Sequence, residues 1–183
     1  LITVVLGIMA AWMVYRAPNE KVQLVLDSLF TLPMILPPTV VGFFLLLVFG
    51  VKGPVGKFLL DFFGYKIAFQ WPATVLAATV ISFPLMYRNA KGAFDQVDRN
   101  LLDCARTLGM SETTILWKVL IANAIPGLVS GSILSFARGL GEVGATSMIA
   151  GNIAGKTRTL PVAVYTEVAA GNMDKAMVYV ACI

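Results

Sequence analysis

Three long stretches without a charged residue constrain this chain more than any other feature of its sequence. They run over Ser28–Val51, Ile67–Tyr87 and Val119–Ala137 and contain 24, 21 and 19 residues. A helix needs about 20 predominantly apolar residues to cross the hydrocarbon core of a bilayer, and about 18 is the usual lower limit. Hydrophobic residues make up 58% of the chain and charged residues only 13%, whereas about 25% of a soluble domain is charged. The sequence therefore predicts a membrane protein with several spans, and excludes a soluble enzyme, a secreted disulfide scaffold and a disordered tail.

Two shorter uncharged runs, Leu1–Tyr15 and Ala176–Ile183, lie at the two ends of the chain. Neither is long enough to cross a membrane alone, and we interpret both as truncated helices of a longer protein. The first run is not typical of a signal peptide, because it has neither a basic start nor an Ala-x-Ala exit. We therefore expect residues 1–183 to form a single membrane domain that is truncated at both ends.

Proline interrupts the first long run. Pro33, Pro37 and Pro38 each remove a backbone N–H donor and disturb a helix. Such breaks persist in membranes where neighbouring helices or water satisfy the freed carbonyl groups. The pattern predicts either a kinked helix or a short re-entrant approach, followed by a helix over Thr39–Phe49. Further on, apolar residues at helical spacing within Lys57–Phe63 predict a short helix that lies at the membrane interface.

The segment Arg88–Lys118 holds nine of the chain's 24 charged residues. It carries the local signals of two short helices that are separated by a turn. These signals are a capping carboxylate at Asp95 or Asp98, a glycine suited to the left-handed position at Gly109, a capping hydroxyl at Ser111 and an acid in the first turn at Glu112. They predict a helix–turn–helix that lies outside the hydrocarbon.

The sequence lacks several features on which enzyme sites in a membrane depend. The chain has no histidine, and its two cysteines, Cys104 and Cys182, lack the spacing of metal ligands. It has no G-x-x-x-x-G-K-[ST] phosphate loop, and the three long runs contain no acid. A membrane-embedded enzyme would need such groups, so we expect no catalytic residue and no metal on this chain. A stand-alone channel or an ion-coupled carrier is an alternative, although carriers usually have acids within the membrane.

The segment Asp103–Gly109 resembles the cytoplasmic EAA loop of ABC-importer permeases, in which a Glu-Ala-Ala…Gly run forms two short coupling helices that dock in a cleft of the ATPase subunit. Asp103 stands in place of the glutamate, Ala105 in place of the second alanine and Gly109 in place of the glycine. The family's Ile-x-Leu-Pro, ten residues further on, is replaced by Val119–Ala122, which has no proline. Three longer stretches are similar to molybdate permease subunits, with sulfate permeases as close relatives: Leu32–Gly42, Phe136–Thr146 and Gly151–Pro161.

This resemblance implies an all-α fold: a polytopic transmembrane helical bundle of the type I ABC importer permease kind, with about five spans and cytoplasmic coupling helices over residues 95–118. It implies import of molybdate through a pathway formed by two copies of the chain, with tungstate or sulfate as alternative substrates. The implied partners are the second permease copy, two ATPase subunits that hold ATP and Mg, an extracytoplasmic molybdate-binding protein and membrane lipid, but not nucleic acid. The chain itself would bind no cofactor and would lie in the inner membrane of a prokaryotic cell as a multi-pass protein. Basic residues divide seven to seven between the two sides, so only the resemblance places Arg88–Lys118 in the cytoplasm.

The resemblance also assigns roles to particular residues. The predicted ATPase-coupling loop comprises Asp103, Ala105, Gly109, Ser111 and Glu112. The small residue at position 105 is expected to let another protein approach the helix. The alternative interpretation of the whole loop is a solvated turn between two spans. The candidate gate or pathway residues are Pro37, Pro38, Thr39, Arg138, Gly141 and Glu142.

Each candidate gate residue also has a purely structural interpretation. Arg138 and Glu142 are four residues apart and can pair on one helix face, so they either gate the pathway or form an ordinary interface pair. The prolines shape the pathway or only bend the chain. Thr39 contacts a passing oxyanion or bonds to its own backbone, and Gly141 serves a moving break or close helix packing.

Overall fold

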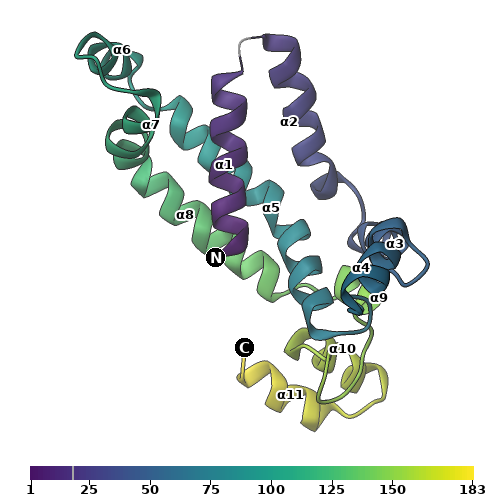
Figure 1. The fold of residues 1–183 in the computed structure, drawn as a ribbon. Coiled ribbons are helices and arrows are strands. Elements are labelled where there is room, and N and C mark those ends of the chain that lie inside the picture. Colours follow the sequence, from purple (N-terminus) through teal and green to yellow (C-terminus); the bar gives the residue numbers. More distant parts are fainter. Residues whose placement is uncertain (18) are drawn as a thin grey trace. The chain divides into compact units, whose positions relative to one another are not determined.

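The computed structural model describes residues 1–17 and 19–183. All the regular structure in these residues is helical, and none of them lies in a strand (Figure 1). The predicted all-α fold is confirmed. The chain divides into two compact units: unit 1 contains residues 1–32 and 82–136, and unit 2 contains residues 33–81 and 137–183. The interpretation of the whole chain as one membrane domain stays a prediction.

Unit 1 is built around the close approach of two helices to a third through small residues. Its helices are α1 (Ile2–Arg16), most of α2 (Glu20–Ile35), the second half of α5 (Trp71–Asp95), α6 (Arg99–Thr107), α7 (Glu112–Ile115), the π-helical turn η1 (Leu116–Leu120) and most of α8 (Ile121–Leu140). A Cβ atom on Gly7 of α1 would lie 2.5 Å from Cγ of Met86 on α5, and a Cβ atom on Gly127 of α8 would lie 2.6 Å from Cβ of Ala93. Glycine therefore lets both α1 and α8 approach α5 closely, as small residues do between membrane helices.

α2 is attached to unit 1 along one stripe of side chains. The structure describes every residue of α2, and none of them is fully buried. The ring centroid of Phe30 lies 5.2 Å from that of Tyr87 on α5, in an edge-on arrangement. One turn away, the Tyr87 hydroxyl donates a 2.7 Å hydrogen bond to Oδ1 of Asp27, and Nζ of Lys91 lies 3.4 Å from the same oxygen. A short aromatic and polar seam thus joins α2 to α5.

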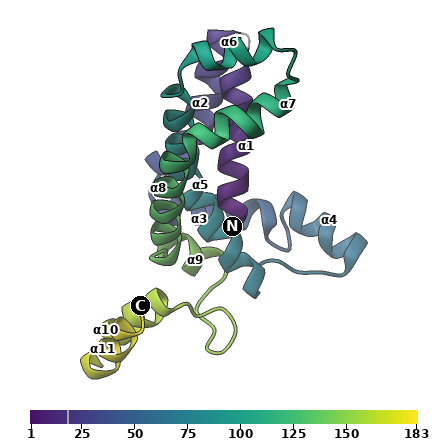
Figure 2. The ribbon, with the colours of Figure 1, turned by 90° about the vertical axis from the view of Figure 1, so that its left-hand side faces the viewer.

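Unit 2 is organised by close contact between α3 (Pro38–Phe49) and α9 (Gly144–Ile149). A Cβ atom on Gly42 would lie 2.6 Å from Cα of Ala145, so only glycine fits there. The other helices of this unit are α4 (Pro54–Phe63), the first part of α5, α10 (Leu160–Ala169) and α11 (Met173–Ala181). α10 and α11 pack side by side (Figures 1 and 2).

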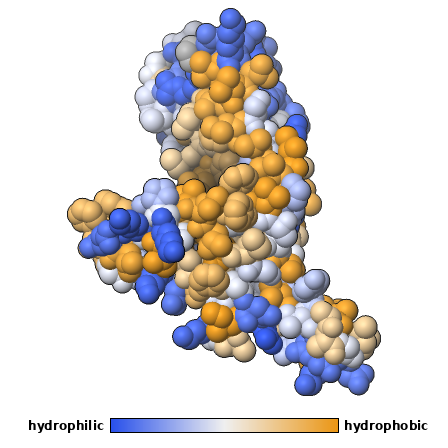
Figure 3. Space-filling model, turned by 90° about the vertical axis from the view of Figure 1, so that its right-hand side faces the viewer, coloured by the Kyte–Doolittle hydropathy of each residue, from blue (hydrophilic) through white to orange (hydrophobic). Residues whose placement is uncertain are grey.

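The predicted spans are found in part. Among the described residues, one helix is long and apolar enough to cross a membrane alone: Glu112–Leu140, of 29 residues, which contains the predicted span Val119–Ala137. α2 and α3 meet this criterion only together, on either side of a break at Leu36–Pro37. Exposed hydrophobic side chains cover broad areas of the face seen in Figure 3. The count of about five spans stays a prediction.

Candidate functional site

The turn between α6 and α7 closes as its local signals predict. Asp98 caps α6, because its carboxylate accepts a 2.9 Å hydrogen bond from the Asn100 N–H, whereas the alternative cap, Asp95, is the last residue of α5. At the other end, Gly109 adopts a left-handed φ of 76°. The Gly109 N–H donates to the carbonyl of Arg106, and the next N–H donates to the carbonyl of Ala105. This reciprocal pair of bonds ends a helix at a left-handed glycine, and it fixes the direction of the turn.

Arg106 ties the two helices together across this turn. Its Nη1 donates to Oδ1 of Asp103 at 2.8 Å, and its Nε donates to Oε1 of Glu112 at 2.9 Å. The hydrogen bond from Arg106 holds the pKa of the Glu112 carboxyl below its usual value. Ser111 caps α7 by accepting a bond from the Thr114 N–H at 3.3 Å, as predicted. Because the second helix continues through η1 into α8, the predicted coupling helix and the predicted span form one continuous helix.

Ala105 faces the interior of unit 1. Its exposed fraction is only 4%, and it belongs to the buried cluster that also contains Leu102 and Ile115. Its small side chain therefore allows α6 to pack on its own unit, and the expected approach of another protein at this position stays a prediction. Beside the turn glycine, this segment exposes Leu108 and Met110, with exposed fractions of 77% and 38%, and further apolar residues are exposed at Leu101 and Trp117. The sequence signal for Leu108 and Met110 was a large apolar residue on each side of the turn glycine within a polar segment.

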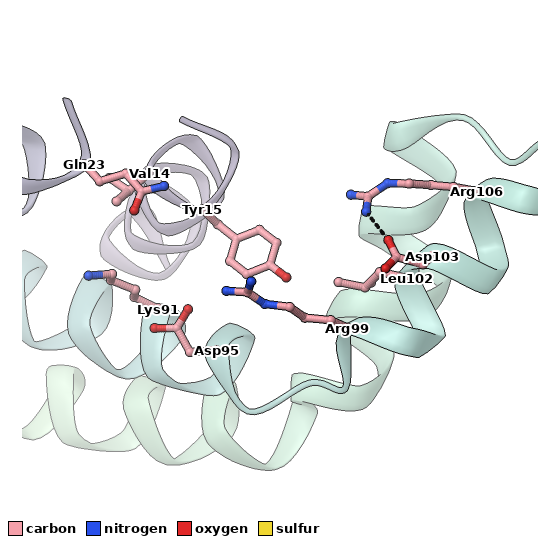
Figure 4. A pocket seen from close by; sticks show the side chains of 9 residues that line it. All are labelled: Val14, Tyr15, Gln23, Lys91, Asp95, Arg99, Leu102, Asp103 and Arg106. Atoms are coloured by element: carbon pink, nitrogen blue, oxygen red, sulfur yellow. Dashed lines mark hydrogen bonds and ion pairs between the residues drawn. The ribbon is translucent and has the colours of Figure 1, made fainter. Parts of the chain in front are cut away.

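A cavity of about 400 Å³ lies beside α6 in unit 1 (Figure 4). It is lined by Val14, Tyr15, Gln23, Lys91, Asp95, Arg99, Leu102, Asp103 and Arg106. Figure 4 shows the hydroxyl of Tyr15 directed towards the guanidinium group of Arg99. The two acids and three cations of the lining give a nearly balanced charge. No group of three potential metal-binding side chains occurs among the described residues.

A second set of predicted residues meets in unit 2. Glu142 is 3% exposed. Its Oε2 accepts a 2.8 Å hydrogen bond from Nη1 of Arg138, and its Oε1 accepts a 2.8 Å bond from the N–H of Ala145. The predicted pairing of the two charges is confirmed. A buried carboxylate is costly unless it is paired, and here the pairing also satisfies a donor at the beginning of α9.

The beginning of α3 lies against the beginning of α9. A Cβ atom on Gly144 would lie 3.1 Å from Cβ of Pro38 and 3.3 Å from Cγ2 of Thr39. The structure thus brings Pro38 and Thr39 close to the segment that contains Glu142, although about 100 residues separate them in sequence. For Gly141, the nearest described atom to an added Cβ is a carbonyl oxygen 3.7 Å away, so close packing does not require glycine there.

Comparison with known proteins places these features in a family. The family model for the inner membrane components of binding-protein-dependent transport systems matches residues 3–182. The chain belongs to this family. As an inner membrane component, it is a transport subunit and not an enzyme, which confirms the predicted class.

Several transport permeases are similar to this inner membrane component over most of its length. The putative molybdenum transport system permease protein YvgM of Bacillus subtilis is 41% identical, over 100% of this chain and 80% of the relative. The molybdenum transport system permease protein ModB of Escherichia coli K12 is 45% identical, over 87% of this chain and 69% of the relative. ModB of Haemophilus influenzae is 37% identical, over 88% and 70%. These relatives confirm the resemblance to molybdate permeases that the sequence motifs indicated.

Proposed function

We propose that the chain is the membrane-spanning permease subunit of an ATP-driven importer for molybdate. The observation that carries this proposal is identity of 37–45% to three permeases named for molybdenum transport, over 87–100% of the chain. The proposal includes two copies of the chain around one pathway, a multi-pass position in a prokaryotic inner membrane, and an extracytoplasmic protein that delivers the oxyanion. ATP and Mg would be held by two partner ATPase subunits, and this chain would hold no cofactor.

The turn at Gly109 supports the coupling part of this proposal. A docking element has to stay rigid, and here the closed turn and the bond from Arg106 to Glu112 hold α6 against the following helix, while the bond from Arg106 to Asp103 lies within α6. That following helix is continuous from Glu112 to Leu140. With a rise of about 1.5 Å per residue, 29 residues extend over roughly 43 Å. A push on the turn would therefore travel along a single helix to the neighbourhood of Arg138.

The exposed side chain of Leu108 offers a specific test of docking. Leu108→Asp should abolish co-purification of the ATPase with the permease, because a carboxylate would enter an apolar contact. Leu108→Met is the matched control, since it keeps an apolar side chain of similar volume, and it should bind as the natural chain does. Equal recovery of the ATPase with both variants would contradict the docking role.

Transport itself is tested in liposomes that contain the permease, its ATPase and its binding protein. We expect uptake of radiolabelled molybdate that requires ATP inside and the binding protein outside. Preferential uptake of sulfate, or stronger competition by tungstate than by molybdate, would reassign the substrate within the oxyanions. Uptake that continues without ATP and without the binding protein would overturn the proposal in favour of a channel or a carrier.

A further inference from the structure

The short helix α4 carries an apolar stripe that no other part of its unit covers. Val55, Phe58 and Phe62 are spaced three and four residues apart, so they share one helix face. Their exposed fractions are 36%, 53% and 74%. The two phenylalanine rings lie against one another, with centroids 4.6 Å apart. The 10 residues of α4 extend over roughly 15 Å, which is too short to cross a bilayer.

The charges of α4 lie on a different face. Lys57 and Asp61 are four residues apart and both exposed. At about 100° per residue, Lys57 is displaced by about 130° and Asp61 by about 90° from the middle of the apolar stripe. Leu59 and Leu60 are partly buried, and Gly56 is fully buried, so these three residues face the rest of the unit. α4 therefore has a packed side, an exposed apolar side and an exposed charged side, and Phe63 at the end of the helix is also exposed, with a fraction of 71%.

The position of α4 is fixed by its contact with the end of α3. A Cβ atom on Gly53 would overlap the carbonyl oxygen of Leu47, and one on Gly56 would overlap that of Gly50. The Gly53 N–H also donates a 2.8 Å hydrogen bond to the carbonyl of Gly50. Glycine thus lets α4 rest directly on the last turn of α3, and the apolar stripe has a defined direction.

The surroundings of α4 identify what covers the stripe. α3 exposes Phe43, Phe44 and Leu47, with exposed fractions of 46–52%, as a helix in contact with lipid does. α5 begins at Trp71, which is 66% exposed, and Tyr65 precedes it at 50%. Tyr and Trp are enriched where membrane helices meet the headgroups. The chain between α3 and α5 therefore lies at one surface of the bilayer, and its exposed apolar side chains continue those of α3.

We propose that α4 lies flat on the bilayer surface as a lipid-binding interfacial helix. Its side chains Val55, Phe58 and Phe62 lie among the acyl chains, and Lys57 and Asp61 lie among the headgroups. A short helix with one apolar and one charged face binds membranes in this way. α4 thereby holds α3 at a fixed depth in the bilayer. α3 in turn contacts Gly144, which is two residues from Glu142. This proposal depends on membership of a membrane family and not on the transported substrate.

Nitroxide labels at single cysteines test the orientation of α4. The native thiols Cys104 and Cys182 are both exposed, so both are first replaced by serine. Cysteine variants at Phe58 and Phe62, with matched controls at Lys57 and Asp61, are labelled and reconstituted as the full chain in liposomes of phosphatidylethanolamine and phosphatidylglycerol. Power saturation then measures access of apolar oxygen and of polar nickel-EDDA to each label.

We expect the labels at positions 58 and 62 to be more accessible to oxygen than to nickel-EDDA, and the labels at 57 and 61 to show the reverse. Equal access of nickel-EDDA at all four positions would overturn the proposal, since the stripe would then face water. Exclusion of both reagents at 58 and 62 would also overturn it. In that case spin–spin broadening would identify a second copy of the chain as the cover, and its absence would identify another subunit.

Discussion

Substitutions at Gly109 change the backbone of the turn between α6 and α7 without removing a side-chain contact. Its φ of 76° lies in the left-handed region, and no described atom lies within 4 Å of the Cβ that another residue would add. Alanine therefore meets only backbone strain, which costs about 1–2 kcal/mol for an L-residue in this region. Proline cannot adopt a positive φ at all, and it lacks the N–H that donates to the carbonyl of Arg106 at 2.9 Å. Loss of this bond costs about 0.5–1.5 kcal/mol in addition, so the turn has to rearrange.

The expected outcome is a graded loss. Gly109→Ala should lower the free energy of unfolding by about 1–2 kcal/mol and keep part of the transport activity. Gly109→Pro should insert into the membrane but lose both transport and stimulation of the partner ATPase. Gly92→Ala is the matched control, because Gly92 is a helical glycine with no described atom near its added Cβ. It should be neutral or more stable by about 0.5–1 kcal/mol.

The assay combines thermal unfolding of each purified variant with binding-protein-stimulated ATP hydrolysis and molybdate uptake in liposomes. Full transport by Gly109→Pro would refute the assignment of this turn as the coupling element. Loss of activity in Gly92→Ala as great as in Gly109→Ala would also refute the reasoning, since the effect would then not arise from the left-handed backbone.

Three further contacts in the two units are tested by thermal unfolding of variants. Arg138→Gln leaves the buried carboxylate of Glu142 without its cation and should lower the free energy of unfolding by about 1–3 kcal/mol. Adding Glu142→Gln should recover part of this loss. No loss in the single variant would show that solvent alone balances the carboxylate. Gly42→Ala brings a Cβ to 2.6 Å from the backbone of α9 and should cost about 1–3 kcal/mol by overpacking. Gly141→Ala, with its nearest atom at 3.7 Å, should stay within about 0.5 kcal/mol of the natural chain, and equal costs at both glycines would contradict the packing of α3 on α9. Tyr87→Phe removes a 2.7 Å hydrogen bond to the carboxylate of Asp27 on α2 and should lower the free energy of unfolding by about 0.5–1.5 kcal/mol. An unchanged melting temperature would show that this contact between α5 and α2 does not hold α2.

Local chemistry made the helix ends of the polar segment predictable. A carboxylate or hydroxyl caps a helix through N–H groups two or three residues away, and glycine ends one through its own backbone. Asp98, Gly109 and Ser111 act in this way in the structure. Lys118 lies in the π-helical turn η1, through which the helix that begins at Glu112 continues to Leu140.

Partners that are distant in sequence were not predictable in the same way. The bond between Asp27 and Tyr87 joins positions 60 residues apart, and neither residue has a local pattern that indicates the other. The same holds for the face of α6. A single sequence shows that Ala105 is small, but only the packing of unit 1 shows that this side chain is buried and that Leu108 is exposed.

The continuous helix from Glu112 to Leu140 changes how the two predicted sites are related. The sequence treated the coupling turn and the Arg138–Glu142 pair as separate features, one in a polar loop and one near the end of a span. In the structure a single helix begins with Glu112, which is bonded to Arg106 of the turn, and carries Arg138 in its last turn. Arg138 in turn pairs with a carboxylate that also accepts a hydrogen bond from the Ala145 N–H in the first turn of α9. The Arg138–Glu142 bond therefore connects the end of α8 to the beginning of α9, which packs on α3.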